Sequence, residues 1–274
     1  MQIETNLEPV LPNEGLHVAH LFFRLDYSQW DLLDQRARLE AKTSLAQLLQ
    51  DVRSDKDTQL LTFSVVTPKA DLGFMLLTPD LQRLDLYCKR LAVALGPEVL
   101  SPEFSYLSMT ERSEYTTTED EYAHTLTSQG ISKNSPEFSQ KMEAFRQRMA
   151  KYLSDRLHPN LPDWPVVCFY PMSKRRAGAD NWFSLDFATR KSLMAGHAHV
   201  GRSYQGRILQ LITGSTGLDD MEWGVTLFAR TASDIKAIVY EMRFDEVSAR
   251  YAEFGSFFIG LQMPLQQLFE RLAI

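Results

Sequence analysis

Apolar and polar positions follow the same succession of patterns twice along this chain. In the first half, four short apolar runs bounded by turn residues are typical of β-strands. They lie at 16–25, 60–67, 72–77 and 104–109. Two segments among them, 30–45 and 81–95, repeat apolar residues every three or four positions, as amphipathic helices do. The pattern predicts the order strand–helix–strand–strand–helix–strand, which is a ferredoxin-like unit.

The second half repeats this order. Its apolar runs lie at 166–170, 207–213, 222–229 and 254–261, and its helical patterns at 186–200 and 231–242. The two central hairpins also align, 69–74 against 218–223. An internal repeat of this kind is strong evidence for two copies of one structural unit. We therefore predict an α+β fold in which two ferredoxin-like βαββαβ halves join their sheets side by side, forming a dimeric α+β barrel within one chain.

Four segments follow from these patterns. We expect a polar lead-in at 1–14, a first half at 15–115, a helical connection at 116–160 and a second half at 161–274. The connection begins with threonines and acidic residues and continues as a charged helical pattern with one apolar stripe. We interpret it as a surface connection that covers the edge of the barrel.

Composition narrows the class of protein. With 44% hydrophobic residues, the 274-residue chain can form a substantial core. Its 29 Lys and Arg against 35 Asp and Glu give a net charge of -6, which argues against a nucleic-acid partner. Cys88 and Cys168 lie in apolar surroundings and are interpreted as buried thiols, not as a disulfide framework or a metal site. The polar N-terminus and the short apolar runs predict a cytoplasmic protein without signal peptide or membrane span.

Candidate chemistry is concentrated between residues 166 and 215. Tyr170 ends an apolar run, the cationic run 174–176 follows it, His197 lies on a predicted helix and Gln210 on the next strand. This set suits a site for an anionic, redox-active ligand. Each member also has a plainer interpretation: a hydrogen-bonded tyrosine, a solvated charge run, a core histidine and an amide bonded to backbone. One imidazole is enough for an iron held in a macrocycle, because haem iron takes a single proximal histidine.

Several segments of the second half carry a resemblance to a known family. They are 170–176, 181–182, His197 with 201–204, 210–215, 222–228 and 240–246. Over roughly residues 160 to 262 they closely resemble coproheme decarboxylase, the peroxide-dependent haem b synthase branch of the chlorite dismutase family. The chain departs from the family pattern after Tyr115, where the connection is longer, and at Glu114, where asparagine is common.

The resemblance implies a defined chemistry. Fe-coproporphyrin III (coproheme), both substrate and redox cofactor, would bind the second half with His197 as proximal iron ligand. Hydrogen peroxide would react near Gln210, and Tyr170 would become a radical that removes a hydrogen atom from the propionate at position 2. Carbon dioxide would leave to form a vinyl group, and the propionate at position 4 would follow. The product would be haem b, the last step of coproporphyrin-dependent haem biosynthesis.

The resemblance also implies contacts and partners. Porphyrin contacts fall on Tyr115, Arg156, Tyr170, Pro171, Met172, Ser173, Lys174, His197, Gln210 and Ser248. Cationic side chains among them would offer charge-assisted hydrogen bonds to up to four propionates. Members of the family are usually homopentamers, and a coproporphyrin ferrochelatase would make transient contact to deliver the substrate.

Three other functions fit parts of the sequence. Chlorite dismutase shares the fold and a His-ligated haem b, but it has a distal arginine where this chain has Gln210, so its anionic substrate would lose a cationic partner here. A haem-binding carrier or sensor would need His197 but no oxidisable Tyr170. An RNA-binding module is disfavoured by the acidic charge and by strands that lack the aromatic pattern of RNA-binding sheets.

Overall fold

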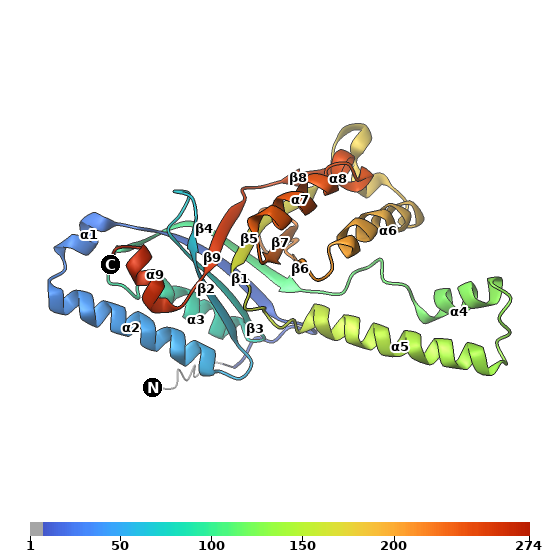
Figure 1. Cartoon of the computed structure of the whole chain (residues 1–274), viewed down its shortest axis with the longest axis horizontal. Helices are drawn as coiled ribbons and strands as arrows, with labels where there is room; N and C mark the ends of the chain where they lie inside the picture. Colours follow the sequence, from blue (N-terminus) through green and yellow to red (C-terminus); the bar gives the residue numbers. More distant parts are fainter. Residues whose placement is uncertain (1–7) are drawn as a thin grey trace.

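The computed structural model describes residues 8–274, which form one antiparallel sheet of nine strands with helices around it (Figure 1). The strands are β1 (His17–Leu25), β2 (Gln59–Val65), β3 (Leu72–Thr78), β4 (Leu100–Thr110), β5 (Val166–Lys174), β6 (Ile208–Gly214), β7 (Trp223–Ala229), β8 (Ala252–Phe254) and β9 (Phe258–Gln262). They pair in the order β7–β6–β4–β1–β3–β2–β9–β5–β8, and a further pairing joins β5 to β7. The pairings therefore run in a closed ring, with β8 attached to it on β5.

Each half of the chain contributes four strands to this ring in the same relative order. The first half pairs as β4–β1–β3–β2, and the second as β9–β5–β7–β6. Numbered within each half, both are the order of a ferredoxin-like sheet. The halves join where β4 pairs with β6 and where β2 pairs with β9. The mixed α+β class predicted from the repeat is confirmed.

The helices are α1 (Tyr27–Leu32), α2 (Gln35–Ser54), α3 (Leu81–Ala92), α4 (Glu119–Ser128), α5 (Pro136–Leu157), α6 (Phe187–Ser203), α7 (Ala232–Met242), α8 (Glu246–Tyr251) and α9 (Leu265–Arg271). Short 3-10 turns lie at Gly178–Asp180 and Trp182–Ser184. Several helices begin at side chains that accept backbone N–H bonds from the first turn, among them Asp80, Asp186 and Thr231. Such residues satisfy donors that have no partner inside the helix.

Some boundaries differ from the sequence prediction. The single helix predicted around 30–45 is two helices, because Leu33 is extended and Asp34 begins a new helix by accepting from the Ala37 N–H. The single strand predicted at 254–261 is divided between β8 and β9. The short helices α8 and α9 hold too few turns to produce a readable periodicity. Residues 1–7 of the predicted lead-in lie outside the described residues.

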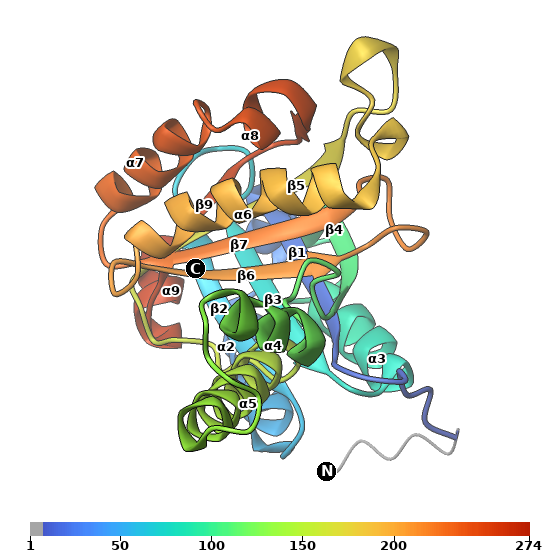
Figure 2. The same ribbon diagram turned by 90° about the vertical axis from the view of Figure 1, so that its right-hand side faces the viewer.

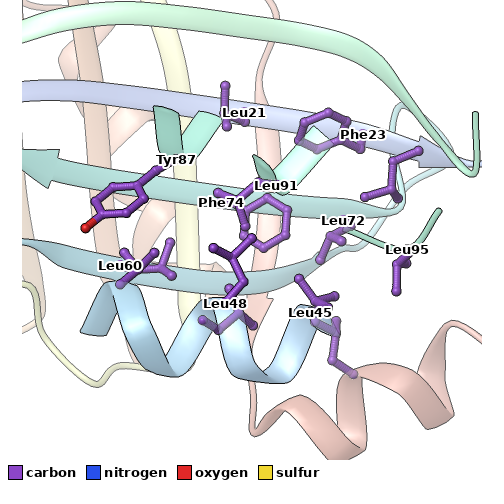
Figure 3. Close-up of a cluster of buried hydrophobic side chains, with 14 of the residues drawn as sticks. Leu21, Phe23, Leu45, Leu48, Leu60, Leu72, Phe74, Tyr87, Leu91 and Leu95 are labelled. Carbon is purple, nitrogen blue, oxygen red and sulfur yellow. The ribbon is translucent and has the colours of Figure 1, made fainter. Parts of the chain in front are cut away.

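Strand alternation divides the apolar side chains into separate clusters. One face of β1, β2 and β3 packs on α2, α3 and α9, in a cluster that includes Phe74 and Leu91 (Figure 3). The opposite faces fill the interior of the ring with aromatic rings, where Phe22 is fully buried and stacks on Phe258 with centroids 4.1 Å apart. A third cluster lies between α7 and the outer face of β5 and β7. The candidate site lies against this third face.

Helices α4 and α5 form an arm that projects away from the sheet (Figure 1). Tyr122 and Phe145 stack between the two helices with centroids 4.3 Å apart. In a capping box at the start of α4, the Thr118 side chain bonds to the N–H of Glu121, and the Glu121 side chain bonds back to the N–H of Thr118. Glu121 also pairs with Lys191 of α6. The segment predicted as a helical connection therefore also contacts the half of the chain that carries His197.

Candidate functional site

A cavity of about 360 Å³ lies on the outer face of β5, β6 and β7. Helix α6 lies alongside β7 and β6 (Figure 2) and contributes residues to the lining. Side chains of α7, of α8 and of the segment 111–115 also line it. The predicted site residues that line the cavity are Tyr115, Arg156, Tyr170, Met172, Lys174, His197, Gln210 and Ser248. The fold thus brings together residues that are far apart in the sequence.

The pleat of β5 decides which of its residues face the cavity, because successive side chains point to opposite faces of a strand. The residues that alternate toward it are Tyr170, Met172 and Lys174. Pro171 lies instead against Gly255, where an added Cβ would stand 2.7 Å from the proline Cγ. The hydroxyl of Ser173 accepts from the N–H of Glu222 at 3.1 Å. These two predicted residues support the strand from its other face.

His197 is held by a carboxylate that lies 48 residues further along the chain. Its Nδ1 is 2.7 Å from Oδ2 of Asp245. The same oxygen caps α8 by accepting from the N–H of Ser248 at 3.2 Å. A carboxylate on Nδ1 fixes the orientation of the ring and leaves Nε2 as the nitrogen that can bind a metal. The imidazole is therefore oriented by Asp245, and its Nε2 is the nitrogen that could bind a metal.

The donor set suits a metal that arrives inside a macrocycle. Across residues 8–274 there is no group of three or more His, Cys, Asp or Glu side chains able to hold a metal ion. A haem iron needs only one protein ligand on its proximal side, because the porphyrin supplies the others. His197, in the wall of the cavity, is an imidazole that could supply this ligand.

Lys174 is a buried cation at the end of β5. Its residue is 8% exposed, and its Nζ lies 4.9 Å from the centroid of the Trp182 ring. Burial lowers the pKa of Lys174 to about 8, while the charges of Asp245 and Glu222 act in the opposite direction. Burying an ammonium costs free energy unless it is paired, so an anionic ligand group would be favoured beside it.

Tyr170 lies in an aromatic wall of the cavity. It stacks on Phe257 with centroids 4.3 Å apart and is tilted against Phe254 at 5.8 Å. Burial raises the pKa of Tyr170 and Cys168 acts in the same direction, while Arg243 opposes them. The phenol therefore stays protonated at neutral pH, and its O–H hydrogen is available for transfer.

Gln210 lies where α6 approaches β6 closely. A Cβ added at Gly201 would stand 3.1 Å from Nε2 of Gln210 and 3.6 Å from Cε of Met242. Glycine at this position lets the helix approach the amide. The registers of β5, β7 and β6 put Tyr170 and Ile212 in one row across the sheet, with Gln210 two residues earlier on β6. The phenol and the amide therefore occupy neighbouring rows of the same cavity floor.

The segment after β4 and the end of α5 supply a polar wall. The carboxylate of Glu111 rests on Gly214, where an added Cβ would collide with Oε2. The Nε of Arg156 donates to the backbone carbonyl of Glu111 at 3.2 Å. Tyr115 stacks on Phe187 of α6 with centroids 5.9 Å apart. Burial raises the pKa of Glu111, and Arg156 opposes that shift.

Sequence reasoning missed several residues of this site. Trp182 and Trp223 line the cavity, and Asp245 orients His197, although none was singled out for a role. All three lie within the segments that carry the family resemblance, so an indication was present there. Glu111 carried no comparable indication, because nothing in its neighbourhood predicts that its carboxylate packs on Gly214.

The burial of α6 is consistent with a ligand-covering helix. Every one of its side chains keeps part of its surface exposed, although the helix is 17 residues long. Met194 and His197 on its inner side line the cavity instead of packing on the sheet. A flat ligand between this helix and the sheet would bury that side.

Fold and cavity together define a class: an α+β protein with a closed ring of two ferredoxin-like halves and one imidazole-bearing cavity on the second half. The family model of chlorite dismutase matches residues 38–263. The chain therefore belongs to the chlorite dismutase family.

Individual relatives agree with this assignment. A curated protein of Natronomonas pharaonis, named as a putative heme-binding protein, is 37% identical over 264 residues, which are 95% of this chain and 41% of that protein. The chain thus spans about two fifths of the length of this curated relative. A solved structure described as a novel heme-binding protein from Thermus thermophilus is 36% identical, with a TM-score of 0.79, and the match covers 98% of this chain and 100% of that one.

A variant of chlorite dismutase from Candidatus Nitrospira defluvii shares the fold at 16% identity. Its TM-score is 0.71, and the match covers 96% of this chain and 97% of that one.

Among the helices within residues 8–274, none combines the length and apolar character needed to cross a bilayer.

Proposed function

We propose that this chain binds Fe-coproporphyrin III through His197 and uses hydrogen peroxide to convert it to haem b. The observation that carries the proposal is the position of Tyr170. A buried, protonated phenol shares one cavity with an imidazole that a carboxylate orients. Binding alone would require the imidazole, whereas oxidative chemistry also requires an oxidisable side chain near the ligand.

The polarity of the cavity supports a ligand with an apolar ring and anionic edges. Lys174 and Arg156 lie toward the end of the sheet where Gly214 pairs with Trp223. The neighbouring wall toward the other end of β7 is apolar and contains Leu227, Ile238 and Val239. Cations at one end suit carboxylates, because charge-assisted bonds to carboxylates are strong, and the apolar wall suits a macrocycle.

The residues would divide the chemistry among them. When bound, the iron porphyrin supplies the reaction with hydrogen peroxide, and one peroxide balances the two-electron oxidation of each propionate to vinyl and carbon dioxide. Tyr170 would give up the hydrogen of its hydroxyl and regain one from the propionate. Phe254 and Phe257 would exclude water from the phenol. Lys174 and Arg156 would hold the propionates in position.

A haem-binding protein without turnover is the second candidate. Two relatives at 36% and 37% identity favour it, since both are described as heme-binding proteins. The same His197 and cavity would serve this function. Tyr170 would then be a wall residue, and its hydroxyl would have no chemical role.

Titration of the apo-protein with ferric coproheme, followed by hydrogen peroxide and mass spectrometry, separates the two candidates. Stepwise loss of two carbon dioxide units is the result that the proposal requires. Tyr170→Phe should bind coproheme yet stop before the first loss, and Tyr240→Phe, at a residue 64% exposed on α7, is the matched control. Normal product from the Tyr170 variant would refute its radical role. Binding without loss of mass by the unaltered protein would establish the second candidate.

The homopentamer and the contact with a ferrochelatase, which the family resemblance implies, stay predictions, as does the cytoplasmic location. Light scattering of the purified protein measures the number of subunits directly. A mass of five 31.4 kDa chains is expected.

A further inference from the structure

Glu222 is a buried carboxylate immediately behind the cavity. Its residue is 3% exposed, and its Oε2 accepts the backbone N–H of Lys174 at 2.8 Å. Its Oε1 accepts from Arg176, whose Nε lies 3.1 Å away and whose Nη2 makes a second, shorter bond. Its own N–H donates to the carbonyl of Met172 at 3.0 Å. One residue therefore ties together the last residues of β5.

This clamp acts on the residue that faces the ligand. Lys174 lies at the end of β5 and pairs there with Ala252 of β8, beyond the last residue that pairs with β7. The hydrogen bond from the N–H of Lys174 to Glu222 therefore fixes the backbone of β5 one turn of the pleat beyond its pairing with β7. Glu222 does not itself line the cavity within residues 8–274, so it would act on the ligand without touching it, through the position and the charge of Lys174.

We propose that Glu222 is a positioning residue of the porphyrin site, which places Lys174 by its backbone and supports the charge of its ammonium for a carboxylate of the ligand. The inference rests on the proposed function, in that it takes the ligand to be a porphyrin with propionates. It adds a role to a residue outside the cavity, and it predicts how ligand affinity depends on pH.

Charged groups face Lys174 from several elements. Asp245 at the start of α8 and Glu222 just before β7 favour its protonated form, while burial disfavours it. Lys174 also lines a second hollow, together with four other charged residues: Arg175, Arg176, Asp220 and Glu253. Arg176 pairs with Glu222 and so reduces the negative charge that Lys174 experiences.

The sign of the pH effect follows from these charges. The protonated form of Lys174 binds an anion, so affinity is constant below the pKa of this residue in the ligand-free protein, which is about 8. Above that pH, binding must take up a proton, and affinity falls by up to about tenfold per pH unit. The pH at which affinity begins to fall is called the break. Glu222→Gln keeps the hydrogen-bond acceptor and removes the charge, so the break should move to lower pH. Arg176→Gln leaves Glu222 uncompensated, so the break should move to higher pH.

The test measures the affinity of zinc coproporphyrin III by fluorescence between about pH 6.5 and 9.5, a range that brackets the expected break. This probe keeps all four carboxylates and accepts one axial ligand, and it performs no peroxide chemistry. Arg207→Gln is the matched control, because Arg207 is a cation of the same half that pairs with Asp234 at 3.6 Å and lies away from Lys174 and from the clamp. Opposite shifts of the break in the Glu222 and Arg176 variants, with none in the control, support the proposal.

Unchanged breaks in both variants would overturn it, as would equal shifts in all three. If the Glu222 variant fails to fold, the upward shift expected of the Arg176 variant still decides. Failure of the inference is distinguishable from failure of the proposed function. A protein that binds the zinc porphyrin with shifted breaks but releases no carbon dioxide from coproheme would retain the role of Glu222 and lose the decarboxylation.

Discussion

The bond between His197 and Asp245 predicts how a single substitution should change the affinity for a metalloporphyrin. Asp245 has two tasks: its Oδ2 bonds Nδ1 of His197 at 2.7 Å, and it caps α8 through the N–H of Ser248 at 3.2 Å. Asparagine caps helices about as well as aspartate, so Asp245→Asn should change the unfolding free energy little through the cap. The substitution therefore keeps the cap and removes a carboxylate charge that acts on both the imidazole and Lys174, and the Soret band reports the effect on the imidazole.

Losing a carboxylate partner of a metal-binding histidine typically costs about 10- to 100-fold in metal affinity. That factor corresponds to about 1.4 to 2.7 kcal/mol of binding free energy. We expect the affinity of Asp245→Asn for ferric coproheme to fall within this range, with a shifted Soret band. The assay is absorbance titration of the apo-protein at neutral pH, together with urea unfolding to show that the fold is retained.

The matched control is Asp186→Asn, which makes the same substitution at the cap of α6 without touching His197. Asp186 accepts from the N–H of Thr189 at 2.9 Å, so this variant measures how much affinity is lost through an Asp-to-Asn change at a helix start alone. The reasoning fails if Asp245→Asn binds coproheme with unaltered affinity and spectrum. It also fails if the two variants lose affinity equally, because the effect would then come from helix capping.

Three further predictions concern other contacts. His197→Ala should lose the axial ligand and change the Soret band, and free imidazole should restore the band. The control is His199→Ala, two residues on, which should leave the spectrum unaltered. An unchanged Soret band in His197→Ala would reject the ligand assignment. Gly201→Ala should displace the side-chain amide of Gln210, because an added Cβ would stand 3.1 Å from its Nε2 and the end of this flexible side chain can move. The variant should therefore slow the peroxide reaction more than it weakens coproheme binding. Its control is Gly196→Ala on the same helix, which has open space around it and should stabilise the fold by up to about 1 kcal/mol. Phe22→Ala should lower the unfolding free energy by about 3 to 5 kcal/mol, measured by urea denaturation, and a loss below about 1 kcal/mol would contradict the packed interior.

Much of the fold could be predicted because its determinants are local. The doubled order of strands and helices follows from period-2 and period-3.6 patterns, and helices are observed where the patterns at 81–95 and 231–242 predicted them. Predictions failed where local signals were short or interrupted. Asp34 divides one predicted helix because its side chain caps a new one, and α8 is only six residues long.

The site was only partly predictable because its partners are distant in sequence. Its candidate residues were indicated by residue type and by resemblance, and most of them line one cavity. Their hydrogen-bond partners were not indicated, since Asp245 meets His197 only after α6, β6, β7 and α7 have been placed. Likewise Glu222 reaches Lys174 across 48 residues, through the pairing of β5 with β7.

Local sequence patterns were enough to predict the repeated α+β order, the positions of most elements and the residue types available for chemistry, because steric preferences and periodicity act over a few residues. The folded structure was needed to show that Tyr170 and Lys174 face the cavity while Pro171 and Ser173 face away. It also decided that one carboxylate orients the imidazole and another holds the strand end. These outcomes depend on strand register and on closure of the ring, and both are set by contacts between segments that no local pattern contains.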